Sequence, residues 1–202
     1  MTAEEILHVA TQQFLRHGLR NVSMDDLARI CGISKKTIYK FFEDKESLIR
    51  RALEEFLHHQ RLISDLSAQQ AQNAIEAHCR MVRQLSLQMQ EFTTHVTYEL
   101  RKYYPALWEL IENFHKTYVT GFIRENLKRG IREGLYEKDV DTEMTPSFYV
   151  ALIRGVLMFD TDLMKNYSFP KVYQYLILYH LMAITTPAGK EEIKRQFSEL
   201  NL

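Results

Sequence analysis

The chain has 202 residues, which is enough for one sizeable core or for a small domain joined to a larger one. Its 26 basic and 26 acidic side chains cancel, so any argument for nucleic-acid binding must rest on local charge. The only cysteines, Cys31 and Cys79, are isolated, which excludes a disulfide framework and a CxxC metal pair. With no signal-like start and no apolar run of membrane-spanning length, these features favour a soluble protein of the reducing cytoplasm.

Apolar residues recur at intervals of three and four along the whole chain, and only 7 Gly and 4 Pro interrupt them. This spacing is typical of amphipathic helices, and no long alternating pattern indicates a strand. We therefore predict an all-α fold, with a small helix-turn-helix domain over residues 1–46 and a second helical domain over residues 47–202.

Three short helices are predicted in the first 45 residues. The first runs from about Thr2 to His17, and Gly18 suits a left-handed cap at its end. Ser23 can cap a second helix, which Gly32 breaks, and Ser34 can cap a third that runs to about Phe42. A tight glycine turn between the second and third helices is the signature of a helix-turn-helix, whose last helix enters the DNA major groove.

The third helix separates apolar from basic side chains. Ile38 and Phe42 lie one turn apart and are expected to face inward. The expected DNA-contacting side chains are then Lys35, Lys36, Thr37, Tyr39 and Lys40, with Lys45 at the start of a fourth helix. Lysines neutralise phosphates or donate to guanine, and Thr and Tyr hydroxyls reach phosphates or base edges. A lysine trio alone is more often an ordinary solvated face; the caps, the glycine turn and the buried pair favour DNA.

These residues resemble the tetracycline-repressor (TetR) family of bacterial transcriptional regulators. The run from Gly32 to Leu48 carries the strongest likeness, GISKKTIYKFFEDKESL, and Ile6, Ala10, Phe14 and Gly18 match ahead of it. The resemblance implies that the six residues above contact an operator, and that the chain beyond about residue 50 senses a ligand and dimerises. It also implies a pseudo-palindromic operator and, usually, a repressor released by a small molecule. The chain departs from many members in lacking a basic arm, since its first basic residue is Arg16, so we expect modest affinity and no N-terminal minor-groove contact.

The second domain is predicted to hold a helix over about 72–92, a shorter one over 93–102, and a long one over 105–129. After a loop to Asp141, two further helices end near Lys165 and Ile184, and the tail from Lys190 can form one more. The candidates for an apolar effector pocket are Phe92, Tyr103, Trp108, Ile111, His115, Tyr118, Phe148 and Leu152. Such mixed apolar and polar side chains suit a hydrophobic or aromatic ligand without formal charge. Each of them is more often a core residue than a pocket residue.

The two last long helices carry more apolar surface than a single flank needs, which favours a two-fold interface between copies. The residues expected there are Val156, Phe159, Leu163, Tyr173, Ile177, His180 and Leu181. A shift of the helix that begins at Lys45 would couple an effector to the spacing of the two recognition helices.

Catalysis is not expected, because the histidines are scattered and no nucleophile, metal-ligand or phosphate-loop motif occurs. No cofactor or metal is predicted. The alternative to a DNA-binding regulator is a protein of the same fold whose third-helix surface binds a protein partner; the balanced charge of residues 1–60 keeps that alternative open.

Overall fold

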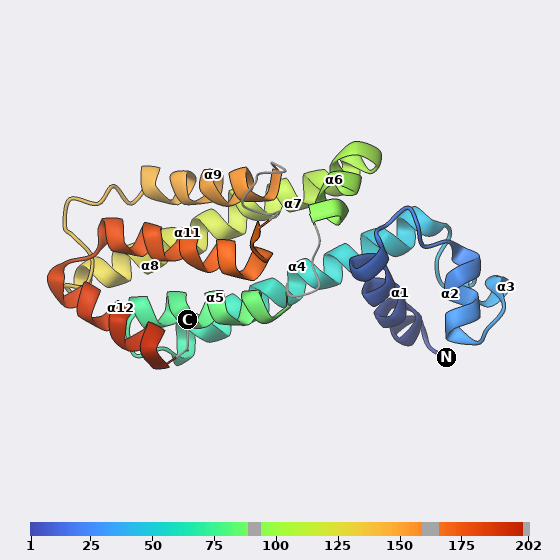
Figure 1. The fold of residues 1–202 in the computed structure, drawn as a ribbon, viewed down its shortest axis with the longest axis horizontal. Coiled ribbons are helices and arrows are strands. Elements are labelled where there is room, and N and C mark those ends of the chain that lie inside the picture. The colour runs from blue at the N-terminus through green and yellow to red at the C-terminus, as the bar shows by residue number, and fades with distance from the viewer. Residues whose placement is uncertain (89–93, 159–165, 200–202) are drawn as a thin grey trace. The chain divides into compact units, whose positions relative to one another are not determined.

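The computed structural model describes residues 1–88, 94–158 and 166–199, and every regular element in those ranges is a helix (Figure 1). One isolated bridge pairs Tyr136 with Thr185. The all-α prediction is confirmed. Contacts divide the chain into two compact units: unit 1 holds Met1–His59 and Glu91–Ile111, and unit 2 holds Gln60–Gln90 and Glu112–Leu202.

Unit 1 contains three short N-terminal helices, the first half of a long helix, and two helices from later in the chain. These are α1 (Ala3–His17), α2 (Met24–Cys31), α3 (Lys35–Ile38), the start of α4 (Lys45–Gln70), α6 (Thr94–Tyr103) and most of α7 (Pro105–Phe114). Each of these helices begins close to the residue expected from the sequence. The helix α3 ends earlier than expected, at Ile38 instead of about Phe42. Its chain continues to Phe42 as tightened turns, in which the Phe41 and Phe42 N–H groups donate to the Ile38 carbonyl at 3.0 and 3.1 Å.

Local hydrogen bonds set the starts of the first helices. Thr2 and Ser23 each form a capping box, with Glu5 and Asp26 as their partners three residues on. Gly32 ends α2 with φ 64° and ψ 29°, the left-handed conformation that a turn requires here. Gly18 also has a positive φ of 87°, but its ψ of 160° is not the left-handed cap expected from the sequence.

The core of unit 1 joins the helix-turn-helix to α6 and α7. The expected stripe of α1 is buried, as are Ile38 and Phe42. Val96, Leu100 and Leu107 from α6 and α7 are buried in the same cluster. The compact unit is therefore larger than the segment 1–46 expected for this domain, because side chains some 50 residues later in the chain complete its core.

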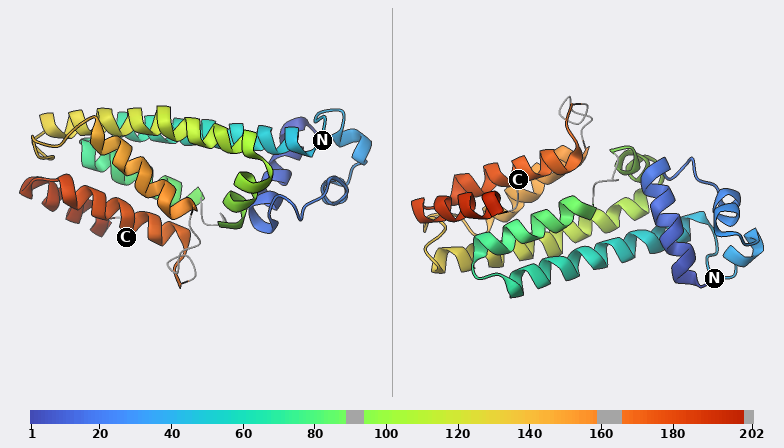
Figure 2. Two further views of the ribbon diagram at one scale, coloured as in Figure 1. Left: turned by 90° about the horizontal axis from the view of Figure 1, so that it is seen from above. Right: turned by 60° about the horizontal axis from the view of Figure 1, so that its bottom comes forward.

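Unit 2 is a layered helical bundle. Its elements beyond α4 and α7 are α5 (Ala74–Gln88), the π-helical segment η2 (His115–Val119), α8 (Thr120–Arg132), α9 (Met144–Met158), α11 (Phe169–Ile184) and α12 (Pro187–Glu199). Within this unit α5 packs against α8, α11 and α12, and α9 packs against α8 and α11 (Figure 2). No helix in the described ranges is long and apolar enough to cross a membrane.

One long helix was expected over residues 105–129, and the structure interrupts it. Residues His115–Val119 form a π-helical turn between α7 and α8. Two threonine hydroxyls donate to backbone carbonyls there, Thr117 to Asn113 at 2.6 Å and Thr120 to His115 at 3.1 Å. Such side-chain hydrogen bonds compete with the regular backbone hydrogen bonds of an α-helix. Hydrophobic periodicity alone does not predict them.

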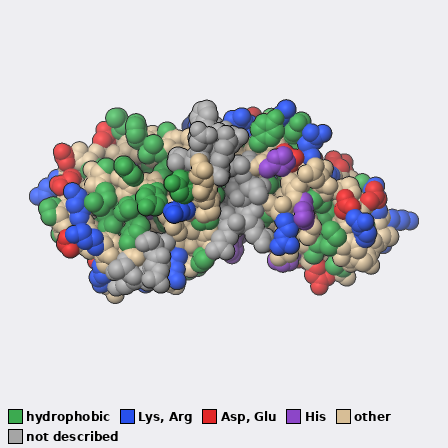
Figure 3. Space-filling view, viewed as in Figure 1, with side chains coloured by type: hydrophobic (Ala, Val, Ile, Leu, Met, Phe, Trp, Pro, Cys, Tyr) green, Lys and Arg blue, Asp and Glu red, His purple; other side chains and the backbone are tan. Residues whose placement is uncertain are grey.

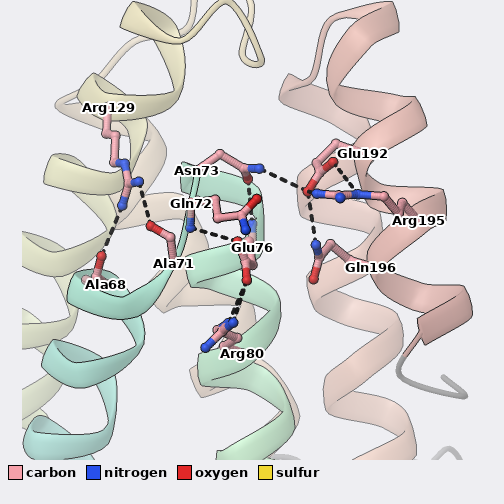
Figure 4. Close-up of polar contacts among 10 residues, drawn as sticks. All are labelled: Ala68, Ala71, Gln72, Asn73, Glu76, Arg80, Arg129, Glu192, Arg195 and Gln196. Carbon is pink, nitrogen blue, oxygen red and sulfur yellow. Dashed lines mark hydrogen bonds and ion pairs between the residues drawn. The ribbon is translucent and has the colours of Figure 1, made fainter.

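The glutamine-rich stretch 67–73 forms the end of α4 and the turn into α5 (Figure 4). The Arg129 guanidinium donates to the Ala68 and Ala71 carbonyls at 3.0 and 2.9 Å. Asn73 donates to Glu192 of α12 at 3.0 Å. These contacts hold the turn against α8 and α12.

Candidate DNA-binding site

The recognition segment from Ser34 to Phe42 presents a polar face on an apolar anchor. The Ser34 hydroxyl accepts from the Thr37 N–H at 3.1 Å and caps α3. Ile38 is 0% exposed, which fixes the rotation of the short helix on the core of unit 1. Lys36, Tyr39 and Lys40 then lie on the exposed face, with Tyr39 44% exposed. Three side chains that can donate hydrogen bonds are thereby directed into solvent from one short, anchored segment.

Lys35 and Thr37 are held by neighbours in the same domain. The Lys35 ammonium forms a 2.8 Å ion pair with Asp25, which raises the pKa of the lysine. The pair is exposed, so it contributes little stability and can exchange for a phosphate. The Thr37 hydroxyl shares a 2.8 Å hydrogen bond with the Ser34 hydroxyl, and the side chain is half-buried. Thr37 therefore shapes the helix start as well as facing outward.

Lys45 is the least free of the six predicted residues. Its ammonium donates to the Arg20 carbonyl at 3.3 Å, and partial burial lowers its pKa. At the same helix end the Asp44 carboxylate accepts from the Ser47 N–H at 2.7 Å. One backbone donor at the start of α4 is thus occupied by the chain itself.

A contact that the sequence did not indicate ties α6 to the helix-turn-helix. The Glu99 carboxylate is 3% exposed and accepts from the Leu19 N–H and, at 3.2 Å, from the Arg20 N–H. His95 lies 3.1 Å from the other oxygen of the same carboxylate. Because these partners are about 80 residues apart, no local pattern could have revealed the contact. The connection between α1 and α2 is therefore fixed by a buried carboxylate from α6.

The predicted pocket residues are divided between the two units of the chain. Tyr103, Trp108 and Ile111 belong to unit 1: the Arg20 guanidinium lies 4.3 Å from the Tyr103 ring centre, and the other two pack on the core of that unit. Phe92 lies outside the described residues. The other candidates belong to unit 2. His115 and Tyr118 are partly buried there, whereas Leu152 and Phe148 are exposed.

Tyr118 is held within unit 2. Its hydroxyl donates to the Asp65 carboxylate at 2.7 Å and lies 3.0 Å from the Arg61 carbonyl. Burial and the neighbouring Asp65 charge raise the pKa of the phenol. Tyr118 therefore links η2 to α4, and its hydroxyl is already used.

The predicted dimer residues are largely internal. Tyr173, Ile177, His180 and Leu181 are buried within unit 2, and none of them is more than 8% exposed. Phe159 and Leu163 lie outside the described residues, and Val156 is half-buried. The exposed apolar side chains on the same helices are Met144, Phe148 and Leu152 of α9 and Tyr175, Tyr179 and Met182 of α11. Figure 3 shows hydrophobic side chains gathered over α9 and α11.

Comparison with known proteins agrees with this geometry. Residues 6–52 match the family model described as bacterial regulatory proteins, tetR family. The HTH-type transcriptional regulator UidR of Escherichia coli K12 is 24% identical over 192 residues, which cover 87% of this chain and 91% of UidR. The uncharacterized HTH-type regulator YvaF of Bacillus subtilis is 28% identical over 95 residues, 46% of this chain and 50% of YvaF, so the match spans half the length of that relative.

A solved structure shows the same fold. The putative transcriptional regulator from Saccharomonospora viridis, in complex with choline, superposes with a TM-score of 0.73 over 91% of this chain and 97% of its own, at 19% identity. The fold and the exposed basic segment define a helix-turn-helix transcriptional regulator. Residues 6–52 are thus a DNA-binding domain of the tetR type, and the relatives that the chain resembles along most of its length are transcriptional regulators. Members of the family bind DNA and often dimerise and bind small-molecule effectors.

Proposed function

We propose that the chain is a cytoplasmic, dimeric repressor that binds a palindromic operator through its recognition segment and is released by a small effector. The observation that carries the proposal is the exposed set Lys36, Tyr39 and Lys40, held in place by the fully buried Ile38. Lysines and a tyrosine hydroxyl on an anchored short helix suit phosphate and base-edge contacts in a major groove. Lys35, Thr37 and Lys45 complete the proposed contact surface from its edges.

The paired residues have an indirect role in this proposal. Lys35 leaves Asp25 for a phosphate, which costs little because their ion pair is exposed. Lys45 positions the connection between α1 and α2 through the Arg20 carbonyl, and its charge adds to the positive potential of the surface. Loss of Lys45 should therefore weaken DNA binding partly by loosening the domain.

The proposed dimer uses the exposed face of α9 and α11 in place of the internal residues expected from the sequence. Phe148 and Tyr179 are 64% and 79% exposed, and large side chains this open are costly on a face that meets only water. A second copy of the same face would bury both sets around a two-fold axis. Each protomer would then present one recognition segment, as a palindromic operator requires.

The proposed effector is hydrophobic or aromatic, and unit 2 binds it. Of the residues expected to line the pocket, His115 and Tyr118 keep a partly buried position there, while Phe148 and Leu152 lie on the exposed α9 face. We place the site at the partly buried pair, because ligand sites combine burial with a few polar groups. The exposed pair serves the proposed dimer.

A selection of genomic DNA fragments tests the proposal directly. Purified protein is mixed with the fragments at low salt, and the bound DNA is sequenced, with the double variant Lys36→Ala/Tyr39→Ala run in parallel. The expected result is enrichment of a palindromic site that the double variant does not enrich. Lys138→Ala, an exposed lysine of unit 2, is the matched control and should enrich the same site. If the folded wild-type dimer enriches nothing, the alternative of a protein partner for the recognition segment is favoured.

A further inference from the structure

The helical break at η2 lies beside a cluster of three ionisable side chains in unit 2. Glu112 and His115 are three residues apart on one side of the α7–η2 segment, and Arg154 faces them from α9, which packs against η2. The Arg154 guanidinium forms a 2.6 Å ion pair with one oxygen of Glu112. This ion pair joins α9 to α7.

Each member of this cluster keeps one buried polar atom without a hydrogen-bond partner among the described residues. These atoms are the second carboxylate oxygen of Glu112, Nδ1 of His115 and Nε of Arg154. A buried donor or acceptor that lacks a partner typically costs about 1–3 kcal/mol. Such groups are uncommon in folded proteins, and three of them at one contact call for an explanation.

The backbone at the cluster is also irregular. The π-helical turn begins at His115 itself, where the Thr120 hydroxyl donates to the His115 carbonyl. Single π turns inside α-helices are rare and frequently occur at functional sites. The irregular backbone and the unpartnered side-chain atoms are independent observations, and they coincide at one residue.

The chemistry of the cluster specifies what it can bind. The charges of Glu112 and Arg154 cancel, and burial together with the Arg154 charge lowers the pKa of His115 to about 4, so the imidazole is neutral at neutral pH. The unpartnered atoms offer an acceptor on Glu112, a donor on Arg154 and, on His115, either role according to its tautomer. A carboxylate ligand would be repelled by Glu112, and an ammonium ligand would be repelled by Arg154.

We propose that Glu112, His115 and Arg154 form the polar end of the effector site and bind an uncharged group that carries a donor and an acceptor side by side, such as a carboxamide. The carbonyl of that group accepts from Arg154 Nε–H, and its N–H donates to the free oxygen of Glu112. The Phe114 ring, 6.2 Å from the His115 ring centre to centre, places an aromatic group next to the cluster. The inference rests on the proposed function, since it takes the ligand of this site to be the effector.

Three fluorinated fragments test the charge preference. 4-Fluorobenzamide, 4-fluorobenzoate and 4-fluorobenzylamine share one ring and differ in the charge of the head group, and their binding can be followed by fluorine NMR. Fragments of this size bind with dissociation constants on the order of millimolar. The wild-type protein is expected to bind the amide about tenfold more tightly than the other two, because only the amide satisfies the unpartnered atoms of Glu112 and Arg154 without a charge conflict.

Two substitutions should exchange the preference. Glu112→Gln leaves the Arg154 charge unpaired, so the benzoate should become the preferred fragment; Arg154→Gln leaves the Glu112 charge unpaired, so the benzylamine should. Glu143→Gln breaks the Arg124–Glu143 pair, which lies 3.0 Å apart elsewhere in unit 2, and should keep the wild-type order. Circular dichroism checks the fold, and the near-isosteric Glu112→Gln carries the test if Arg154→Gln does not fold.

The inference is overturned if the wild-type protein binds none of the fragments up to about 10 mM, or if the order of binding is the same in all variants. DNA binding is measured for each protein without fragment. Loss of fragment selectivity with intact DNA binding defeats the ligand site alone. Absence of DNA binding by the wild-type protein defeats the proposed function while leaving the fragment result unaffected.

Discussion

At the scale of single residues, the buried histidines of unit 2 predict a response to acid. His78 is 1% exposed, its imidazole lies 3.2 Å from the Tyr149 hydroxyl, and its ring centre is 6.0 Å from that of His180. Burial, followed by the nearby His180, lowers the pKa of His78 to about 3, and burial lowers that of His180 to about 4. Both imidazoles are therefore neutral in the folded protein and become charged in the unfolded chain near pH 6.5.

The free energy of unfolding is thus expected to fall as the pH falls from about 6.5 towards 4. In that window the unfolded state binds protons that the folded state does not, so each buried histidine contributes a slope of up to about 1.4 kcal/mol per pH unit. Urea unfolding between pH 7 and pH 5 should show that His78→Gln has a shallower pH dependence than the wild-type protein. The exposed His8→Gln is the control. An unchanged slope in His78→Gln would mean that His78 is not kept neutral by burial.

Glu99 is expected to stabilise unit 1 through its contact with the α1–α2 connection. Its carboxylate accepts two backbone N–H groups from the α1–α2 connection, and hydrogen bonds to a charged group contribute about 1.5–3 kcal/mol each. Glu99→Gln should therefore lower the midpoint of chemical unfolding and weaken DNA binding, since the position of α2 depends on this connection. The exposed Glu109→Gln provides the comparison. Equal stability and equal DNA affinity in the two variants would show that Glu99 is only a structural neighbour.

At the scale of elements, the sequence was informative wherever a local pattern decides the structure. Caps at Ser23 and Ser34, the glycine turn at Gly32 and the buried Ile38 all follow from spacing and side-chain chemistry, so the helix-turn-helix could be predicted almost residue by residue. The length of α3 was overestimated, because the turns that lead to Phe42 tighten after Ile38.

Features that depend on contacts between distant side chains were harder to predict from the sequence. The π-helical turn at His115 depends on threonine hydroxyls that bond to the backbone, and periodicity does not register it. The apolar stripe of α11 was real, but spacing cannot tell which buried face meets its own chain and which meets a second copy. Tyr173 and Ile177 proved internal, whereas Tyr175 and Tyr179 face outward.

This distinction gives a prediction for the assembly. Tyr179→Glu places a charge on the exposed face of α11, where the proposed two-fold contact would bury it, so sedimentation should show a shift from dimer to monomer. Leu66→Glu places a charge at an exposed leucine of α4 and should leave the dimer intact. A Tyr179→Glu protein that remains dimeric would move the interface to another surface.

At the scale of the whole molecule, effector sensing requires that a ligand in unit 2 alter the DNA affinity of unit 1. Among the described residues, two helices run from one unit into the other: α4 belongs to both, and α7 begins in unit 1 and ends in unit 2. The Glu99 contact adds that α6, which directly precedes α7, holds the α1–α2 connection. The sequence analysis named only α4 as the element that transmits the effector signal. We expect α6 and α7 to transmit it together with α4.

Reciprocal binding measures this coupling. An effector that releases the operator must bind the free protein more tightly than the protein–DNA complex, by the same factor that it weakens DNA binding. Calorimetric titration of an effector in the presence and absence of operator DNA should therefore give two different affinities. Equal affinities would exclude the proposed release mechanism, whatever the effector.

The central claim is that the segment anchored by Ile38 binds DNA phosphates and bases, and the most direct test is the salt dependence of binding to the selected site. For the wild-type dimer the logarithm of the affinity should fall steeply and linearly with the logarithm of the salt concentration. Lys36→Ala should lower this slope by about 2 in a dimer, one contact for each protomer, while Lys138→Ala leaves it unchanged. A slope near zero, or one that Lys36→Ala does not alter, would contradict the account.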